Sequence, residues 1–159
     1  MSKKYINTSN ISSNNSSIGS VNRVQPLEWV LPNKKEFPEW IHKTFIKYEL
    51  KNTSTQKTIK QSKTNTPTKK VFTPFPYQNF LRDYLQASSP YRGILLYHGL
   101  GSGKTCTSIH IAESLKDEKN VVVLLPASIE PNFIEYGLKF CGDKKYQTNA
   151  NAYKEKYSF

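Results

Sequence analysis

The chain has 159 residues and a formal net charge of +11, and 36% of its residues are hydrophobic. This length fits one domain, and no apolar run approaches the ~20 residues that a membrane span needs. The N-terminus lacks the apolar region of a secretory signal, and two cysteines are too few for a disulfide framework, so a reducing intracellular compartment is expected. The basic balance favours a polyanionic partner such as nucleic acid, although a lysine- and asparagine-rich composition that only keeps the chain soluble would give the same charge.

Three segments are expected before the first glycine-rich motif. Residues 1–23 are mostly Ser, Asn, Thr and Lys and predict a disordered tail. Residues 24–50 predict an N-terminal helical segment, and its helix Phe37–Tyr48 carries an aromatic face. Such a face either packs on the protein's own core, which is the commoner case, or docks a partner. Residues 51–70 hold six lysines and no acid, and predict a linker that either contacts phosphates or is only solvated.

The next elements surround a glycine-rich loop. Apolar residues recur at helical spacing over Tyr77–Leu85, which predicts a buried helix with Pro76 in its first turn. The apolar run Ile94–Tyr97 predicts a strand, and a second helix is expected over Lys104–Leu115. Cys106 in that helix is interpreted as a small buried apolar residue rather than a reactive thiol.

A phosphate-binding loop is the function that the segment 98–105 predicts. Strand, glycine-rich turn and helix is the context that such a loop requires, because glycines let backbone N–H groups surround an anion at a helix N-terminus. Lys104 is expected to reach the β- and γ-phosphates and Thr105 to ligate Mg²⁺, and both are assigned to catalysis. His98 stands where the strict pattern has glycine, and the alternative is a chance glycine-rich turn. The candidate ATP-binding residues of the loop are Gly99, Gly101, Ser102, Gly103, Lys104 and Thr105.

The second half of the predicted domain starts with a β-branched run. Val121–Leu125 predicts a fully buried strand, which would form a right-handed βαβ unit with Ile94–Tyr97. A helix is expected over Ile129–Phe140, with Ser128 as its N-cap and Gly142 after its end. Beyond that glycine the chain is polar, and no further strand is expected.

The residues then suggest a family. Pro76-Tyr77-Gln78, the loop with its preceding strand, and the segment Val122–Ser128 followed by Asn132-Phe133 together resemble the start of a superfamily 2 helicase. Within that superfamily the chain is most similar to the helicase-like ATPases of large nucleocytoplasmic DNA viruses, which include the poxvirus early-transcription-factor and nucleoside-triphosphatase proteins. The resemblance covers roughly residues 72–142.

The resemblance implies roles by position. Gln78 matches the glutamine that reads adenine, although a surface helix residue is the alternative interpretation. Residues 101–105 match motif I, which holds the phosphates and Mg²⁺. Pro126, Ala127 and Ser128 match motif Ia, which contacts the nucleic-acid backbone, and a helix start at Ser128 would offer free N–H groups to a phosphate.

The expected fold is α/β: a partial RecA-like P-loop domain over residues 71–159, the first half of helicase lobe one. Asp117-Glu118 precedes a strand rather than ending one, so it is rejected as a metal site, and no arginine finger is found. The chain is therefore interpreted as the N-terminal part of a larger ATP- and Mg²⁺-dependent helicase or translocase on DNA or RNA, inactive alone. Viral transcription machinery would be a partner of this protein, and the protein would be located in the virion or in the infected-host cytoplasm. The rivals are another P-loop NTPase, such as a kinase or GTPase, and a non-catalytic nucleotide- or nucleic-acid-binding module.

Overall fold

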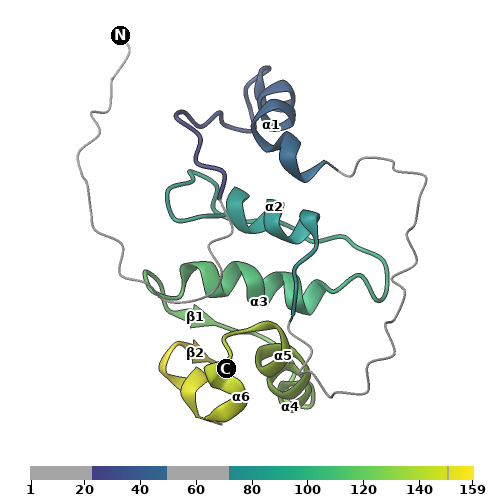
Figure 1. Ribbon diagram of the computed structural model, residues 1–159, viewed down its shortest axis with the longest axis vertical. Helices are drawn as coiled ribbons and strands as arrows, with labels where there is room; N and C mark the ends of the chain where they lie inside the picture. The colour runs from purple at the N-terminus through teal and green to yellow at the C-terminus, as the bar shows by residue number, and fades with distance from the viewer. Residues whose placement is uncertain (1–22, 50–71, 150) are drawn as a thin grey trace, which may run out of the picture.

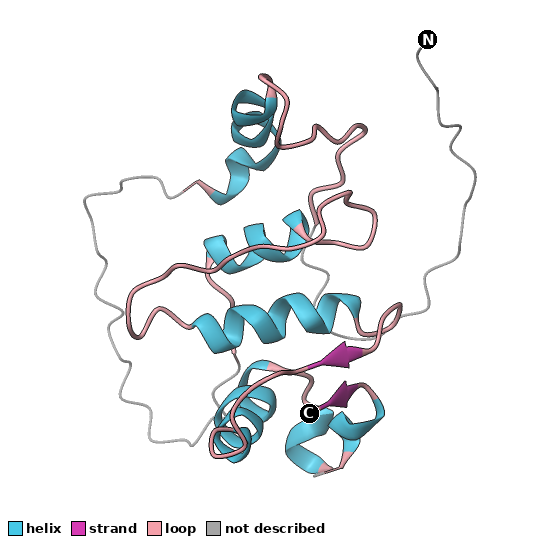
Figure 2. Ribbon diagram, turned by 180° about the vertical axis from the view of Figure 1, so that it is seen from behind, coloured by secondary structure: helices cyan, strands magenta, loops and turns pink. Residues whose placement is uncertain are grey.

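The structure is a computed structural model that describes residues 23–49, 72–149 and 151–159. Of the predicted tail over residues 1–23 the structure describes only Arg23, and the predicted linker over 51–70 lies outside the described residues. Figures 1 and 2 show the described elements following one another along the long axis, from α1 through α2 and α3 to the C-terminal elements. None of the described helices is long and apolar enough to cross a membrane.

The N-terminal segment forms a helix that packs on the rest of the protein through aromatic rings. Helix α1 spans Phe37–Phe45, and a 3-10 turn, η1, continues it over Ile46–Tyr48. The Trp40 ring lies 5.7 Å from Trp29 and 6.5 Å from Tyr91, between centroids. Phe45 meets Phe80 of the next helix edge-on at 5.1 Å. The aromatic face therefore packs on the protein's own core, as the commoner alternative predicted.

Helices α2 (Pro76–Tyr84) and α3 (Lys104–Leu115) pack side by side at the centre of the molecule. The backbone N–H of Phe75 donates to the Gln78 side chain (2.9 Å), which caps the start of α2. His110 of α3 contacts Asn79 of α2 at 3.1 Å, between Nε2 and Oδ1. Both helices form where the apolar spacing predicted them.

The structure differs from the sequence-based prediction in its strands. No strand forms over 94–97, where Leu95 is 88% and Tyr97 95% exposed. The run 121–125 forms only the short strand β1 (Val121–Val122), which pairs in parallel with β2 (Tyr157–Ser158). The expected βαβ unit and the absence of a strand beyond Gly142 were therefore both wrong. The physical reason is that a strand needs a hydrogen-bonding neighbour, and within the described residues the 94–97 run has none.

The helix after β1 starts later than predicted. Its first part, α4, spans Glu130–Asn132, a π-helical segment, η2, covers Phe133–Leu138, and α5 covers Lys139–Cys141. Ser128 is not the N-cap: the cap position is Ile129, because the Ile129 N–H donates to the Pro126 carbonyl in a preceding turn (2.9 Å). Gly142 follows the end of the helix, as predicted.

The described core lies between α3 and the C-terminal elements, which include α6 (Lys145–Thr148) and the 3-10 turn η3 (Ala152–Glu155). Cys106 packs against this core, as the apolar interpretation predicted. Its sulfur is bonded to that of Cys141, with Cα atoms 5.4 Å apart, a pairing that the sequence analysis did not expect. The Glu113 carboxylate accepts the hydroxyls of Tyr146 (3.1 Å) and Tyr157 (2.7 Å). Burial and this carboxylate raise the pKa of the Tyr157 hydroxyl well above its ordinary value. Helices packed on a small parallel sheet give a mixed fold compatible with the α/β class.

Candidate phosphate-binding site

The glycine-rich loop leads directly into helix α3, and two of its glycines adopt conformations that other residues avoid. Gly101 and Gly103 have φ angles of 75° and 77°, in the left-handed region. Gly103 is the N-cap residue, so the helix begins at Lys104. The first N–H groups of a helix have no acceptor within it, and a run of such amides after alternating backbone conformations is an anion-binding concavity. The two left-handed glycines ahead of this helix N-terminus therefore make the loop a candidate anion-binding site.

The Lys104 side chain folds back over the loop. Its ammonium Nζ donates to the carbonyl oxygens of His98 (3.0 Å) and Gly99 (2.8 Å). The side chain is exposed, so the cation is held at the loop surface rather than inside the protein. A phosphate oxygen binds an ammonium more strongly than a neutral carbonyl does, so these two bonds are exchangeable for contacts with a bound anion.

Helix α2 holds the other side of the loop with two consecutive side chains. The Tyr77 hydroxyl donates to the Ser102 carbonyl at 2.5 Å. The Gln78 amide Nε2 donates to the Gly103 carbonyl (3.4 Å) and to the Thr107 hydroxyl (3.1 Å). Because the Gln78 side chain is 1% exposed and its oxygen caps α2, both ends of its amide are engaged. The structure thus brings Gln78 to the loop, as a buried residue and not as the surface helix residue of the alternative interpretation.

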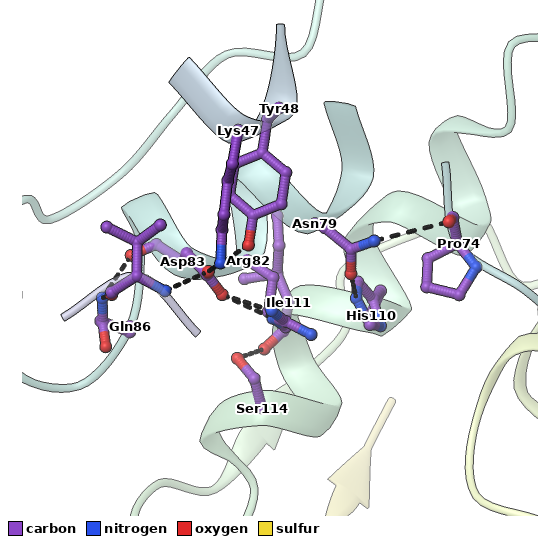
Figure 3. A network of polar contacts seen from close by, with 11 residues as sticks. Lys47, Tyr48, Pro74, Asn79, Arg82, Asp83, Gln86, His110, Ile111 and Ser114 are labelled. Carbon is purple, nitrogen blue, oxygen red and sulfur yellow. Dashed lines mark hydrogen bonds and ion pairs between the residues drawn. The ribbon is translucent and has the colours of Figure 1, made fainter. Parts of the chain in front are cut away.

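A buried carboxylate fixes α2 to the N-terminal segment (Figure 3). Asp83 is fully buried and accepts hydrogen bonds from the Val24 backbone N–H (2.8 Å) and from the Tyr48 hydroxyl. It also pairs with the neighbouring Arg82 at 2.6 Å, and the Lys47 ammonium lies 3.9 Å away. A buried charge with this many donors ties three segments into one geometry, so the helix that carries Tyr77 and Gln78 is rigidly placed.

His110, two turns into α3, is held in its neutral form. Burial lowers the pKa of its imidazole to about 4, and the nearby Arg82 charge acts in the same direction. Its Nε2 contacts Asn79 Oδ1 on α2 (3.1 Å), and its ring lies 6.3 Å from that of Phe72. This histidine therefore joins the two helices as a polar packing residue.

The remaining predicted residues differ in how well they suit an anion. Among the described residues, the Ser102 hydroxyl and His98 Nδ1 are buried without a hydrogen-bond partner, which leaves two polar atoms of the loop available to a ligand. Thr105 is exposed in the first turn of α3, as a hydroxyl that ligates a metal beside a phosphate must be. The loop residues therefore fit a magnesium nucleotide. Pro126, Ala127 and Ser128 lie in an exposed turn between β1 and α4.

Sequence reasoning missed the residues that hold the loop from outside. Tyr77 was assigned to the apolar face of its helix, and its hydroxyl contact is not visible in a periodic pattern. Arg82 and Asp83 were given no role in the sequence analysis, and both are buried. The aromatic residue directly before Gln78 was the available signal for a second contact to the loop.

No family model matches the chain, and no solved structure matches it with significance. A protein of Acanthamoeba polyphaga mimivirus, provisionally named ATP-dependent RNA helicase R563, is 37% identical over 123 residues, which are 77% of this chain and 20% of that protein. A Frog virus 3 protein provisionally named a helicase is 35% identical over 72 residues, 43% of this chain and 8% of that protein. A termination factor NPH-I homolog of African swine fever virus is 42% identical over 48 residues, 30% of this chain and 7% of that protein. The chain thus spans about a fifth, or less, of the length of these relatives.

Proposed function

Since the chain is related to the helicase-like proteins of large nucleocytoplasmic DNA viruses, we propose that it is a nucleotide-binding portion of an ATP-dependent helicase or translocase. The observation that carries this proposal is the loop ahead of α3, with left-handed Gly101 and Gly103 and with Lys104 held over the loop carbonyls. A helix N-terminus that only packs on its neighbours does not need a cation at that point, whereas one that binds a nucleotide phosphate does.

Each candidate residue has a role in this proposal. The backbone amides within Gly101–Thr105 and the Lys104 ammonium hold the phosphates of ATP. Thr105 is the magnesium ligand, and the metal, when bound, neutralises phosphate charge. Gln78 reads adenine through its side-chain amide. Because both ends of that amide are engaged in the structure, adenine binding would exchange at least one of those bonds.

The nucleic-acid partner is proposed from charge and from the relatives. The net charge of +11 favours phosphate contacts, and the turn Pro126-Ala127-Ser128 is exposed and available for them. Either DNA or RNA fits this chemistry. Because one relative is named as a termination factor, a role with viral transcription machinery in the virion or the infected-cell cytoplasm is part of the proposal.

A partial RecA-like domain is the proposed fold, and the exposed apolar runs support it. Leu95, Tyr97 and Leu124 are all at least 88% exposed, on extended segments that lead toward the candidate site and the motif Ia turn. Apolar runs of this kind are typical of strands buried in a parallel sheet. In the proposal, residues 71–159 are the first half of that sheet domain. The chain alone hydrolyses ATP negligibly, because neither of the described strands, β1 and β2, ends in an acidic residue.

Calorimetric titration of the chain with ATP and Mg²⁺ tests the proposal. We expect Lys104→Ala to weaken binding by roughly 10- to 100-fold, because a charge-assisted contact to phosphate is lost. The matched control is Lys119→Ala, which removes an exposed lysine from the turn before β1. The proposal fails if the wild-type chain does not bind, or if Lys104→Ala binds as tightly as Lys119→Ala while both variants remain folded.

A further inference from the structure

We propose that Tyr77 is a positioning residue of the phosphate loop, whose hydroxyl fixes the orientation of the Ser102–Gly103 peptide so that its N–H is presented to the anion. This inference rests on the proposed function, since it concerns how the same loop binds phosphate. It adds a residue that belongs to neither the glycine-rich motif nor the glutamine position.

The argument begins with the peptide that Tyr77 holds. In a planar trans peptide the carbonyl and the following N–H point in opposite directions. The Tyr77 hydroxyl binds the Ser102 carbonyl at 2.5 Å, so the Gly103 N–H points away from α2. Gln78 binds the Gly103 carbonyl in the same manner (3.4 Å), which turns the Lys104 N–H to the same side. Two consecutive amides thus face away from α2, as an anion site requires.

The loop needs such a restraint because of its glycines. Gly103 has φ 77°, but glycine adopts negative φ nearly as readily, so the peptide before it can flip at little cost. A flipped peptide would present the Ser102 carbonyl to the phosphate, and the partial negative charge of the carbonyl oxygen would repel the anion. The hydrogen bond from Tyr77 opposes that flip. Gly103 gives the loop its shape but also makes the flip easy, and this is why the loop needs the hydrogen bond.

Tyr77 is itself held firmly enough for this task. Its ring stacks on Phe75, with centroids 5.6 Å apart and planes 9° apart. The His98 ring, at the start of the loop, meets it edge-on at 5.5 Å. The tyrosine therefore contacts the loop at two points, His98 and the Ser102 carbonyl, and α2 carries it on a backbone that Asp83 anchors.

The test uses Tyr77→Phe, which keeps the ring and removes the hydroxyl. The matched control is Tyr136→Phe, the same change at a tyrosine that is 74% exposed on η2. Affinities for ATP with Mg²⁺ and for inorganic tripolyphosphate are measured by calorimetry, together with the thermal midpoint and the Gly103 amide resonance in ¹⁵N spectra. We expect Tyr77→Phe to weaken both ligands by the same factor, about three- to tenfold, which is the worth of one hydrogen bond. In the free variant the Gly103 resonance should move, while the control changes nothing.

The outcomes separate this inference from the proposed function. If the wild-type chain binds neither ligand, the proposed function fails. If the wild type binds, Lys104→Ala does not, and Tyr77→Phe binds both ligands like the wild type, the function stands and the inference is overturned. A loss for ATP that spares tripolyphosphate would also overturn it, because the defect would then lie at the base rather than at the phosphates. A lower thermal midpoint with unchanged affinity would show that Tyr77 only packs α2.

Discussion

The substitution Asp83→Asn probes how the N-terminal segment is fixed to helix α2. It removes one charge from a fully buried position and leaves the Arg82 guanidinium, whose side chain is 6% exposed, beside a neutral amide. Removal of one partner from a buried pair costs about 3–5 kcal/mol. Asparagine keeps one acceptor oxygen for the Val24 N–H or the Tyr48 hydroxyl, so we expect the lower end, about 3 kcal/mol.

Urea unfolding followed by tryptophan fluorescence measures this loss. Both tryptophans of the chain, Trp29 and Trp40, lie in the N-terminal segment, with ring centroids 5.7 Å apart, so their emission reports on its docking. With a slope of about 2 kcal/mol per molar urea, the midpoint should fall by about 1.5 M. The control Asp117→Asn changes an exposed carboxylate and should move it by less than about 0.3 M. Equal midpoints for the two variants would refute the reasoning, because Asp83 would then contribute no more than a surface charge.

Three further predictions follow from the helices and the charge. The pKa of His110 is near 4 in the folded state and near 6.5 in the unfolded state, so the contribution of neutral His110 to the free energy of unfolding is complete above pH 6.5 and is lost as the pH falls toward 4. Chemical denaturation should show that the free energy of unfolding falls by about 1–2 kcal/mol over this range, a value reduced by solvent screening. His110→Gln should remove this dependence on pH. Gly137→Ala would place a Cβ 2.9 Å from Ile109 Cδ1, so the variant should be destabilised by about 1–3 kcal/mol and its thermal midpoint should fall. An unchanged midpoint would contradict the close approach of η2 and α3. Oligonucleotide affinity, measured by anisotropy, should fall with salt, and deletion of residues 51–70 should flatten the slope because six lysines leave; an equal slope would mean that these lysines do not contact phosphates.

The helices could be predicted from the sequence because their signals are local. Helix α3 begins at Lys104 and ends at Leu115, as predicted, since the glycine before it and the apolar spacing within it are both read from neighbouring residues. The resemblance to helicase-like proteins of large DNA viruses is also confirmed by the relatives, because the loop and the segments around it are contiguous motifs.

The strands could not be predicted in the same way because pairing is not a local property. The run Ile94–Tyr97 has the composition of a buried strand, yet it forms none, since no described strand pairs with it. Conversely, Tyr157–Ser158 is a short segment in a polar stretch of sequence, and it becomes a strand only because β1 lies next to it. The Asp83 contacts span about sixty residues of sequence, and no periodic pattern encodes them.

A crystal structure of the chain with Mg²⁺ and a non-hydrolysable ATP analogue tests the central claim most directly. The account predicts that the analogue's phosphates lie over the amides of Gly101–Thr105 and that the Lys104 ammonium leaves the His98 and Gly99 carbonyls to contact them. The Tyr77 hydroxyl should remain on the Ser102 carbonyl. A nucleotide bound elsewhere, or one bound at the loop with Lys104 still on its carbonyls, would contradict the account.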